Sequence, residues 1–155
     1  METSNEKAMQ QVAEIQITYR SNVKPSLRPK INASKDTYDV LIQNWDSSKI
    51  EFIEQFKAMF LNRANRVLGI MEISTGGVSG TVADPKVIFG AALKANASGL
   101  IVAHNHPSGN LKASQSDIDL TRKLKEGGKL LEIQLLDHVI VTTEGYFSFA
   151  DEGFI

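Results

Sequence analysis

Two histidines, a serine and an aspartate lie close together in the sequence between residues 104 and 117. His104 and His106 are separated by one residue, Ser114 follows after seven intervening residues, and Asp117 lies three positions later. Two imidazoles and one carboxylate are a natural ligand set for a catalytic zinc ion, and they leave the fourth tetrahedral position free for water. The pattern predicts a metal-dependent hydrolase with one zinc ion per chain.

The elements expected around these residues can bring them to one point. A short apolar run at residues 99–103 predicts a buried strand that ends at His104. Residues two apart in an extended segment point to the same side, so His104 and His106 can reach one metal ion. The helix predicted next presents Ser114 and Asp117 on its first turn, three positions apart and therefore on one face. We expect Asp117 as the third ligand and Ser114 beside the open coordination position.

Simpler structural roles are also compatible with parts of this pattern. Ser114 and Asp117 have the spacing of a helix capping box, and such a cap would fix the helix start that presents the carboxylate. His138 lies on a largely apolar predicted strand. It is interpreted as a core histidine with a local hydrogen bond, Asp137 being the candidate partner, rather than as a fourth ligand.

A zinc hydrolase needs a base to take a proton from the metal-bound water, whose pKa falls to about 7 on zinc. The sequence offers Glu51, Glu54 and Glu72 as candidates. Each of them could instead be a surface carboxylate, which is the usual place of a glutamate. Spacing does not choose among the three.

Composition restricts the classes of function. The chain has 155 residues, 42% of them hydrophobic, which is enough for one domain with its own core. It has no cysteine, which excludes disulfides, thiolate zinc ligands and thiol catalysis. The net charge of −1 gives no general attraction to nucleic acids or anionic membranes. The polar N-terminus does not resemble a signal peptide, and the longest apolar run is too short to span a bilayer, so we expect a cytoplasmic protein without membrane association.

The pattern of elements predicts one mixed α/β domain around a single sheet. Residues 1–10 are expected to be disordered, and residues 11–32 to form a half-buried strand at 13–19 and a basic linker at 24–30. The domain itself is expected over residues 33–155. Its first half is expected to contain a helix capped by Ser34 and running to about Trp45, a hairpin of strands at 54–62 and 66–74, and a glycine-rich loop at 76–80. Its second half is expected to begin with a helix that is capped by Asp84 and runs to about Asn96, followed by the strand at 99–103. A helix at 114–126, stopped by Gly127 and Gly128, and strands at 131–142 and 146–149 are expected to complete the domain.

The chain resembles the JAMM (MPN-domain) metalloproteases, and within them the bacterial RadC family. The residues that carry the resemblance run from His104 to Gly109 and continue with Ser114, Asp117 and Thr121. Further matches lie at residues 136–141 and 146–149 and, upstream, at 54–62, 80–81 and 96–97. The similarity extends from about residue 33 to the C-terminus. Ala113 departs from the pattern, because the family usually has proline there.

The resemblance implies a cytidine deaminase-like MPN fold and a role for each site residue. His104, His106 and Asp117 would hold zinc, Ser114 would steady the bound water and the oxyanion, and Glu54 would be the base that passes the proton to the leaving amine. The implied reaction is hydrolysis of an amide bond in a peptide or isopeptide substrate.

Two other functions are compatible with the sequence. One is a non-catalytic, zinc-stabilised module associated with DNA repair, and the other is a metal-dependent nuclease. The resemblance makes DNA a candidate partner, because full-length RadC proteins carry an N-terminal helix-hairpin-helix region associated with DNA. Residues 1–32 are not expected to form that region.

Overall fold

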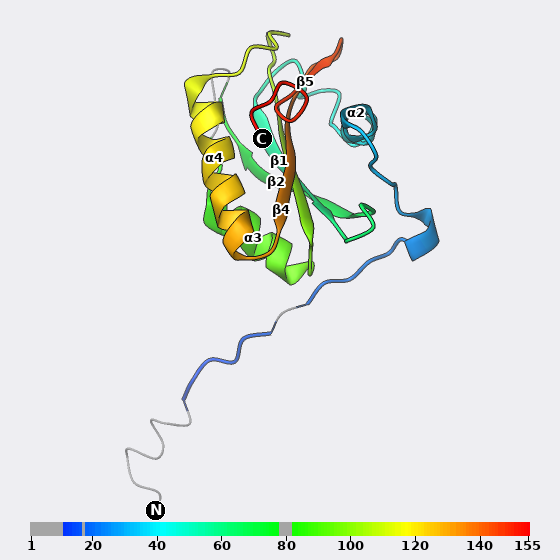
Figure 1. Ribbon diagram of the computed structural model, residues 1–155, viewed down its shortest axis with the longest axis vertical. Helices are drawn as coiled ribbons and strands as arrows, with labels where there is room; N and C mark the ends of the chain where they lie inside the picture. The colour runs from blue at the N-terminus through cyan, green and yellow to red at the C-terminus, as the bar shows by residue number, and fades with distance from the viewer. Residues whose placement is uncertain (1–10, 17, 78–81) are drawn as a thin grey trace, which may run out of the picture.

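A single five-stranded mixed sheet forms the centre of the computed structural model, which describes residues 11–16, 18–77 and 82–155 (Figure 1). The strand order is β2-β1-β3-β4-β5. The elements are η1 (Pro25–Leu27), α2 (Ser34–Gln43), β1 (Gln55–Leu61), β2 (Val67–Thr75), α3 (Pro85–Lys94), β3 (Gly99–Asn105), α4 (Gln115–Leu130), β4 (Gln134–Val141) and β5 (Tyr146–Ser148). The predicted mixed α/β architecture is confirmed.

Strand β3 lies in the middle of the sheet and ends at the candidate metal ligands. It pairs antiparallel with β1 and parallel with β4, so that His104 lies between Phe56 on one side and Ile140 on the other. Every residue of β3 is buried. Strands β1 and β2 form the predicted antiparallel hairpin.

The helices cover the sheet from two sides, with α2 on one face and α3 and α4 on the other (Figure 1). Side chains alternate between these faces along β3, as expected for a central strand. Ile101 and Ala103 belong to the core on the α2 side, and Leu100 and Val102 to the core on the side of α3 and α4. His104 continues the second series, so its imidazole lies on the α4 side of the sheet.

The N-terminal end of α3 is capped as predicted. Asp84 Oδ1 accepts a hydrogen bond from the backbone N–H of Lys86 at 2.9 Å, and Pro85 occupies the first helical position. The helix ends at Lys94, close to the predicted end.

Replacing Asp84 by alanine removes this cap, and we expect the free energy of unfolding to fall by about 1 kcal/mol. Urea denaturation followed by circular dichroism measures the change. Asp119→Ala is the control, because this exposed carboxylate lies inside α4 and a change there is expected to stay within about 0.5 kcal/mol. Equal losses in the two variants would contradict a specific role of the cap.

Helix α4 does not stop at Gly127 and Gly128, and the prediction that these glycines end it was wrong. The helix continues to Leu130. A Cβ atom at Gly128 would lie 2.2 Å from the backbone oxygen of Ile133, and one at Gly127 would lie 2.9 Å from the ring of Phe89. The two glycines therefore allow close packing of α4 against its neighbours.

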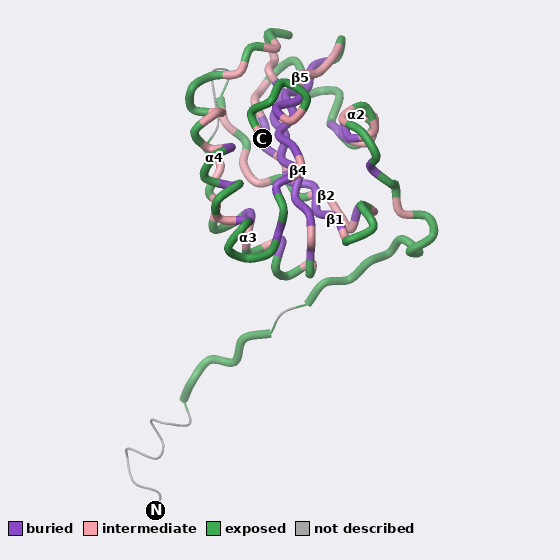
Figure 2. Tube along the Cα trace, in the orientation of Figure 1, coloured by how far each residue is buried: buried purple, intermediate pink, exposed green. Residues whose placement is uncertain are grey.

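The described part of the strand predicted at residues 13–19, residues 13–16 and 18–19, does not form a strand. Residues 11–16 and 18–23 are exposed and contain no strand (Figure 2). The hydroxyl of Tyr19 donates to the backbone oxygen of Leu68 on β2, so this segment touches the sheet through a side chain and not through a strand ladder. The predicted disorder of residues 1–10 lies outside the described residues, as does most of the glycine-rich loop at 76–80.

The start of α2 also differs from the prediction. Ser34 is the first helical residue and not the cap, which is Ala33. Asp36 caps the N-terminal end of α2, because its Oδ2 accepts hydrogen bonds from the backbone N–H groups of Asn32 and Ala33 at 2.8 and 3.0 Å. Among the described residues, no helix is both long and apolar enough to cross a membrane.

Candidate metal centre

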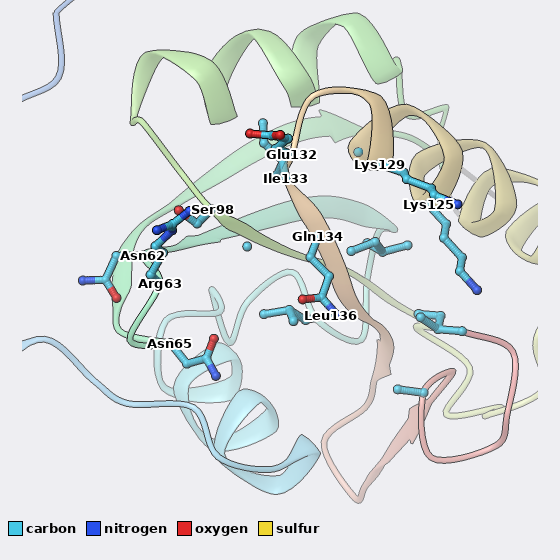
Figure 3. Close-up of a pocket in the computed structure, with 15 residues that line it drawn as sticks. Asn62, Arg63, Asn65, Ser98, Lys125, Lys129, Glu132, Ile133, Gln134 and Leu136 are labelled. Atoms are coloured by element: carbon cyan, nitrogen blue, oxygen red, sulfur yellow. The ribbon is translucent and has the colours of Figure 1, made fainter.

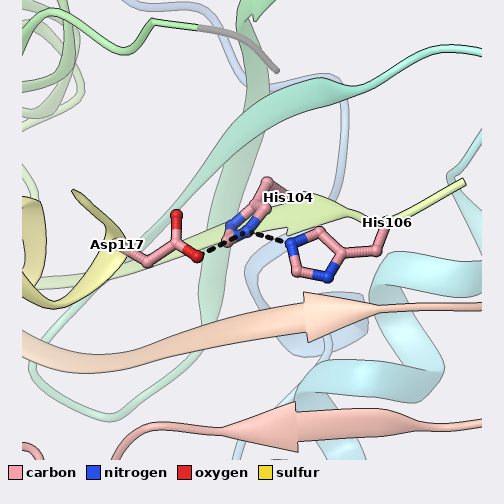
Figure 4. Close-up of side chains that lie close together, drawn as sticks. All are labelled: His104, His106 and Asp117. Atoms are coloured by element: carbon pink, nitrogen blue, oxygen red, sulfur yellow. Dashed lines mark hydrogen bonds and ion pairs between the residues drawn. The ribbon is translucent and has the colours of Figure 1, made fainter. Parts of the chain in front are cut away.

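The structure brings His104, His106 and Asp117 together at the end of β3 (Figure 4). His104 Nε2 lies 3.0 Å from His106 Nε2 and 3.5 Å from Asp117 Oδ2. One potential ligand atom from each residue lies within 4.8 Å of the other two. His104 is only 1% exposed, whereas the Asp117 side chain is 17% exposed, so the cluster is open to solvent on one side.

The two separations measured from His104 Nε2 fit a zinc ion. Zinc–nitrogen and zinc–oxygen bonds of 2.0–2.2 Å in a tetrahedral arrangement place neighbouring ligand atoms roughly 3.3 Å apart. The two separations measured from His104 Nε2 lie close to this value. A donor set of two imidazoles and a carboxylate also favours zinc over magnesium or calcium, because imidazole nitrogen suits zinc whereas magnesium and calcium bind mainly to oxygen.

The turn that follows β3 orients the imidazole of His106. His106 Nδ1–H donates to the backbone oxygen of Asn110 at 2.6 Å. Because a carbonyl oxygen can only accept, the neutral ring carries its proton on Nδ1 and has a lone pair on Nε2. Gly109 allows this turn with a positive φ of 82°. The unprotonated nitrogen of His106 therefore faces His104 and Asp117.

Ser114 and Asp117 form the capping box that the sequence suggested. Ser114 N donates to Asp117 Oδ2 at 2.9 Å, and Asp117 N donates to Ser114 Oγ at 3.1 Å. Burial acts to raise the pKa of Asp117 and its hydrogen bonds, with Ser114 among the donors, act to lower it; the resulting pKa lies well below its ordinary value. The cap thus keeps a charged carboxylate in place beside the two imidazoles.

Glu54 lies immediately before β1, at the same end of the sheet as the cluster. Its half-buried carboxyl has a raised pKa, chiefly because of burial. His104 and His106 act to lower this pKa and Asp117 acts to raise it, so the carboxyl lies within electrostatic range of all three candidate ligands.

The other two candidate bases have different surroundings. Glu51 is exposed and accepts a hydrogen bond from the Thr143 hydroxyl at 2.8 Å. Glu72 lies on β2 and accepts from the side chains of Gln55 and Thr75. Neither of these hydrogen bonds involves a candidate ligand, whereas the Glu54 carboxyl lies within electrostatic range of all three.

Asn105 has a positioning role that the sequence analysis missed. It is fully buried between the two histidines. Its Oδ1 accepts from the backbone N–H of Gln55 at 2.7 Å, and its Nδ2 donates to the backbone oxygens of Ile50 and Ile53 at 2.7 and 2.9 Å. These three bonds tie the chain on both sides of Glu54 to the strand that carries the histidines. A buried amide within an apolar strand was the only signal in the sequence.

His138 is a core histidine, as predicted, and it lies outside the group of candidate ligands. It is fully buried, and its Nε2 lies 2.9 Å from His104 Nδ1, on the side of the His104 ring away from the cluster. Its other nitrogen lies 2.7 Å from the Thr121 hydroxyl. The expected partner, Asp137, instead accepts from the backbone N–H of His138 and not from its ring.

A cavity of about 830 Å³ lies at the opposite end of the sheet, where β3 and β4 begin (Figure 3). Its lining includes Arg63, Lys125 and Gln134 but none of the candidate ligands. A smaller cavity of about 150 Å³ borders His106 and is also lined by Glu51. The larger cavity is therefore separate from the candidate metal centre.

Comparison with known proteins agrees with the fold. A family model described as the RadC-like JAB domain matches residues 31–154. A UPF0758 protein of Flavobacterium johnsoniae is 38% identical over 148 residues, which are 95% of this chain and 63% of the relative. A UPF0758 protein of Chlorobaculum parvum is 35% identical over 150 residues, which are 96% of this chain and 66% of the relative.

The chain spans just under two thirds of the length of these relatives. The match to the family model nevertheless includes every candidate ligand, Glu54 and Ser114. The chain therefore belongs to the family of RadC-like JAB domains.

Proposed function

We propose that this protein is a zinc-dependent hydrolase that cleaves amide or isopeptide bonds in a peptide substrate. The observation that carries the proposal is the convergence of His104, His106 and Asp117 on one point within electrostatic range of Glu54. Three protein ligands and one open position are the arrangement of catalytic rather than structural zinc sites. Membership of the RadC-like JAB domain family supports the same assignment.

Each residue has a distinct part in the proposed reaction. A bound zinc ion supplies Lewis acidity, which polarises the substrate carbonyl and lowers the pKa of water. Glu54 takes a proton from the attacking water and delivers it to the leaving amine. Its raised pKa suits both steps, because a base that must also act as an acid works best when its pKa is near the working pH.

Ser114 is proposed to stabilise the negative charge that develops on the substrate oxygen. Its oxygen accepts the capping bond from Asp117 N–H, so the hydroxyl proton is free of that bond and can be donated. A donor fixed before the reaction costs no reorganisation in the transition state. The helix cap and the proposed catalytic role therefore use different parts of one hydroxyl group.

Zinc binding tests the proposal directly. Wild-type protein stripped with a chelator and reloaded with zinc is expected to hold about one ion per chain, whereas His106→Ala and Asp117→Ala each lose one of three ligands and most of the bound zinc. Metal analysis after desalting gives the stoichiometry. Asp119→Ala is the matched control, because it removes an exposed carboxylate from the same helix and leaves the ligands intact. Equal zinc content in all four proteins would refute the site.

Association with DNA and a cytoplasmic location stay predictions from the sequence. Binding of duplex and single-stranded DNA at increasing salt concentration tests the first, since phosphate contacts weaken as salt rises. An absence of binding at low salt would remove the nuclease alternative.

A further inference from the structure

A chain of hydrogen bonds connects α4 to the side of His104 that faces away from the cluster. The Thr121 hydroxyl donates to the backbone oxygen of Asp117 at 2.7 Å. Thr121 Oγ1 also lies 2.7 Å from His138 Nδ1, and His138 Nε2 lies 2.9 Å from His104 Nδ1. The chain begins at the backbone of one candidate ligand, Asp117, and ends at the imidazole of another.

The direction of every bond in this chain follows from its first acceptor. A carbonyl oxygen can only accept, so the single hydroxyl proton of Thr121 is committed to Asp117. The threonine oxygen must then accept from His138 Nδ1–H. A neutral histidine carries one ring proton, so His138 Nε2 is an acceptor and receives the proton of His104 Nδ1–H.

Burial and packing hold the chain in this arrangement. His138 is fully buried, and Thr121 and His104 are 2% and 1% exposed. A second proton on the fully buried His138 ring would place a charge in an apolar environment, which is costly. The ring of Phe149 stacks on His138 with centroids 4.4 Å apart and an angle of 10°, and Phe56 packs edge-on at 5.7 Å. These contacts oppose rotation of the His138 ring.

We propose that Thr121 and His138 are positioning residues that set the tautomer of His104. The proton of His104 is held on Nδ1, and its Nε2 presents a lone pair toward His106 and Asp117 before any metal ion binds. Because Asn110 fixes His106 in the same tautomer, two unprotonated nitrogens and a carboxylate oxygen face one point. The inference rests on the proposed function only in naming zinc as the ion that this arrangement receives.

A matched pair of variants at Thr121 tests the inference. Thr121→Val keeps the shape of the side chain but removes the acceptor for His138 Nδ1–H, so His138 is expected to move its proton to Nε2. His104 Nδ1 then becomes an acceptor and the His104 proton moves to Nε2, where it blocks the ligand position. Thr121→Ser keeps the hydroxyl group and is expected to retain the wild-type tautomers.

Two measurements read the result. Nitrogen-15 NMR of zinc-free protein with labelled histidine gives the tautomer of each ring, and we expect Nδ1–H for His104 and His138 in wild type and Thr121→Ser. Competition with a chelator gives the zinc affinity, which is expected to fall about 10- to 100-fold in Thr121→Val and less than about threefold in Thr121→Ser.

The outcomes separate this inference from the proposed function. The Nδ1–H tautomer of His104 in folded Thr121→Val, with a zinc affinity equal to that of Thr121→Ser, would overturn the inference. An Nε2–H tautomer of His104 in zinc-free wild type would also overturn it, even if Thr121→Val did not fold. Failure of wild type to bind zinc would refute the proposed function, while the NMR result on the zinc-free protein would still decide the tautomer.

Discussion

Replacing Glu54 by glutamine is expected to lower the rate of amide hydrolysis by about 10²- to 10⁴-fold, the usual contribution of a general base. Glutamine has nearly the same shape as glutamate but cannot take a proton from water. Zinc content is expected to stay at about one ion per chain, because Glu54 is not among the three grouped ligands. The variant therefore separates catalysis from metal binding.

The measurement uses zinc-loaded protein and a library of fluorogenic peptide amides and isopeptides. Glu72→Gln is the matched control, since this carboxylate lies on β2 and bonds to Gln55 and Thr75. A rate lost in Glu72→Gln but kept in Glu54→Gln would assign the base to the other glutamate. Bound zinc in a wild-type protein that hydrolyses none of the library would instead favour the non-catalytic module.

The grouping of the three candidate ligands could be predicted from the sequence because their arrangement depends on local geometry. His104 and His106 lie in one extended stretch, and the capping box fixes Asp117 relative to the start of α4. A short turn between these two elements is enough to bring them together. The same locality explains why the caps of α3 and α4 were predicted and are observed.

The residues around the ligands depend on strand pairing, which one sequence does not specify. Glu54 precedes His104 by 50 residues and reaches the cluster because β1 pairs with β3 in a register that places Phe56 opposite His104. The contact between His138 and His104 similarly requires β4 to lie parallel to β3. The resemblance to a known family, and not the spacing of residues, singled out Glu54.

Two local sequence patterns led to wrong predictions, because tertiary contacts and not the local pattern decide what these segments form. The alternation at residues 13–19 is typical of a strand, but a strand forms only when its backbone pairs with a neighbour. The described residues of this segment are exposed instead. Gly127 and Gly128 are typical of a helix end, yet tight contacts with Phe89 and Ile133 explain why glycine is needed inside α4.

Replacing Asn105 by alanine is expected to lower the free energy of unfolding by about 3–5 kcal/mol. The substitution removes two buried hydrogen bonds and one partly buried hydrogen bond, and leaves the N–H of Gln55 and the oxygens of Ile50 and Ile53 without their partner. Each buried group left unsatisfied costs about 1–3 kcal/mol, and partial relaxation recovers some of that sum. For a domain of this size the midpoint of thermal unfolding is expected to fall by roughly 10 °C.

Asn62→Ala is the matched control for this variant. Asn62 Oδ1 accepts from the backbone N–H groups of Ala64 and Arg66 in the hairpin turn between β1 and β2. This side chain is only half-buried, so water can replace its bonds, and the expected loss is about 1 kcal/mol or less. Similar losses of unfolding free energy in the two variants would show that Asn105 stabilises the fold no more than Asn62 does.

Asn105→Ala also tests whether this amide positions Glu54. At a temperature where the variant is still folded, its zinc content is expected to match that of wild type, because all three ligands are present. The rate of hydrolysis should fall toward that of Glu54→Gln, since the bonds that hold the chain on both sides of Glu54 are gone. A folded Asn105→Ala protein with a wild-type rate would mean that β1 pairing alone holds the glutamate in place.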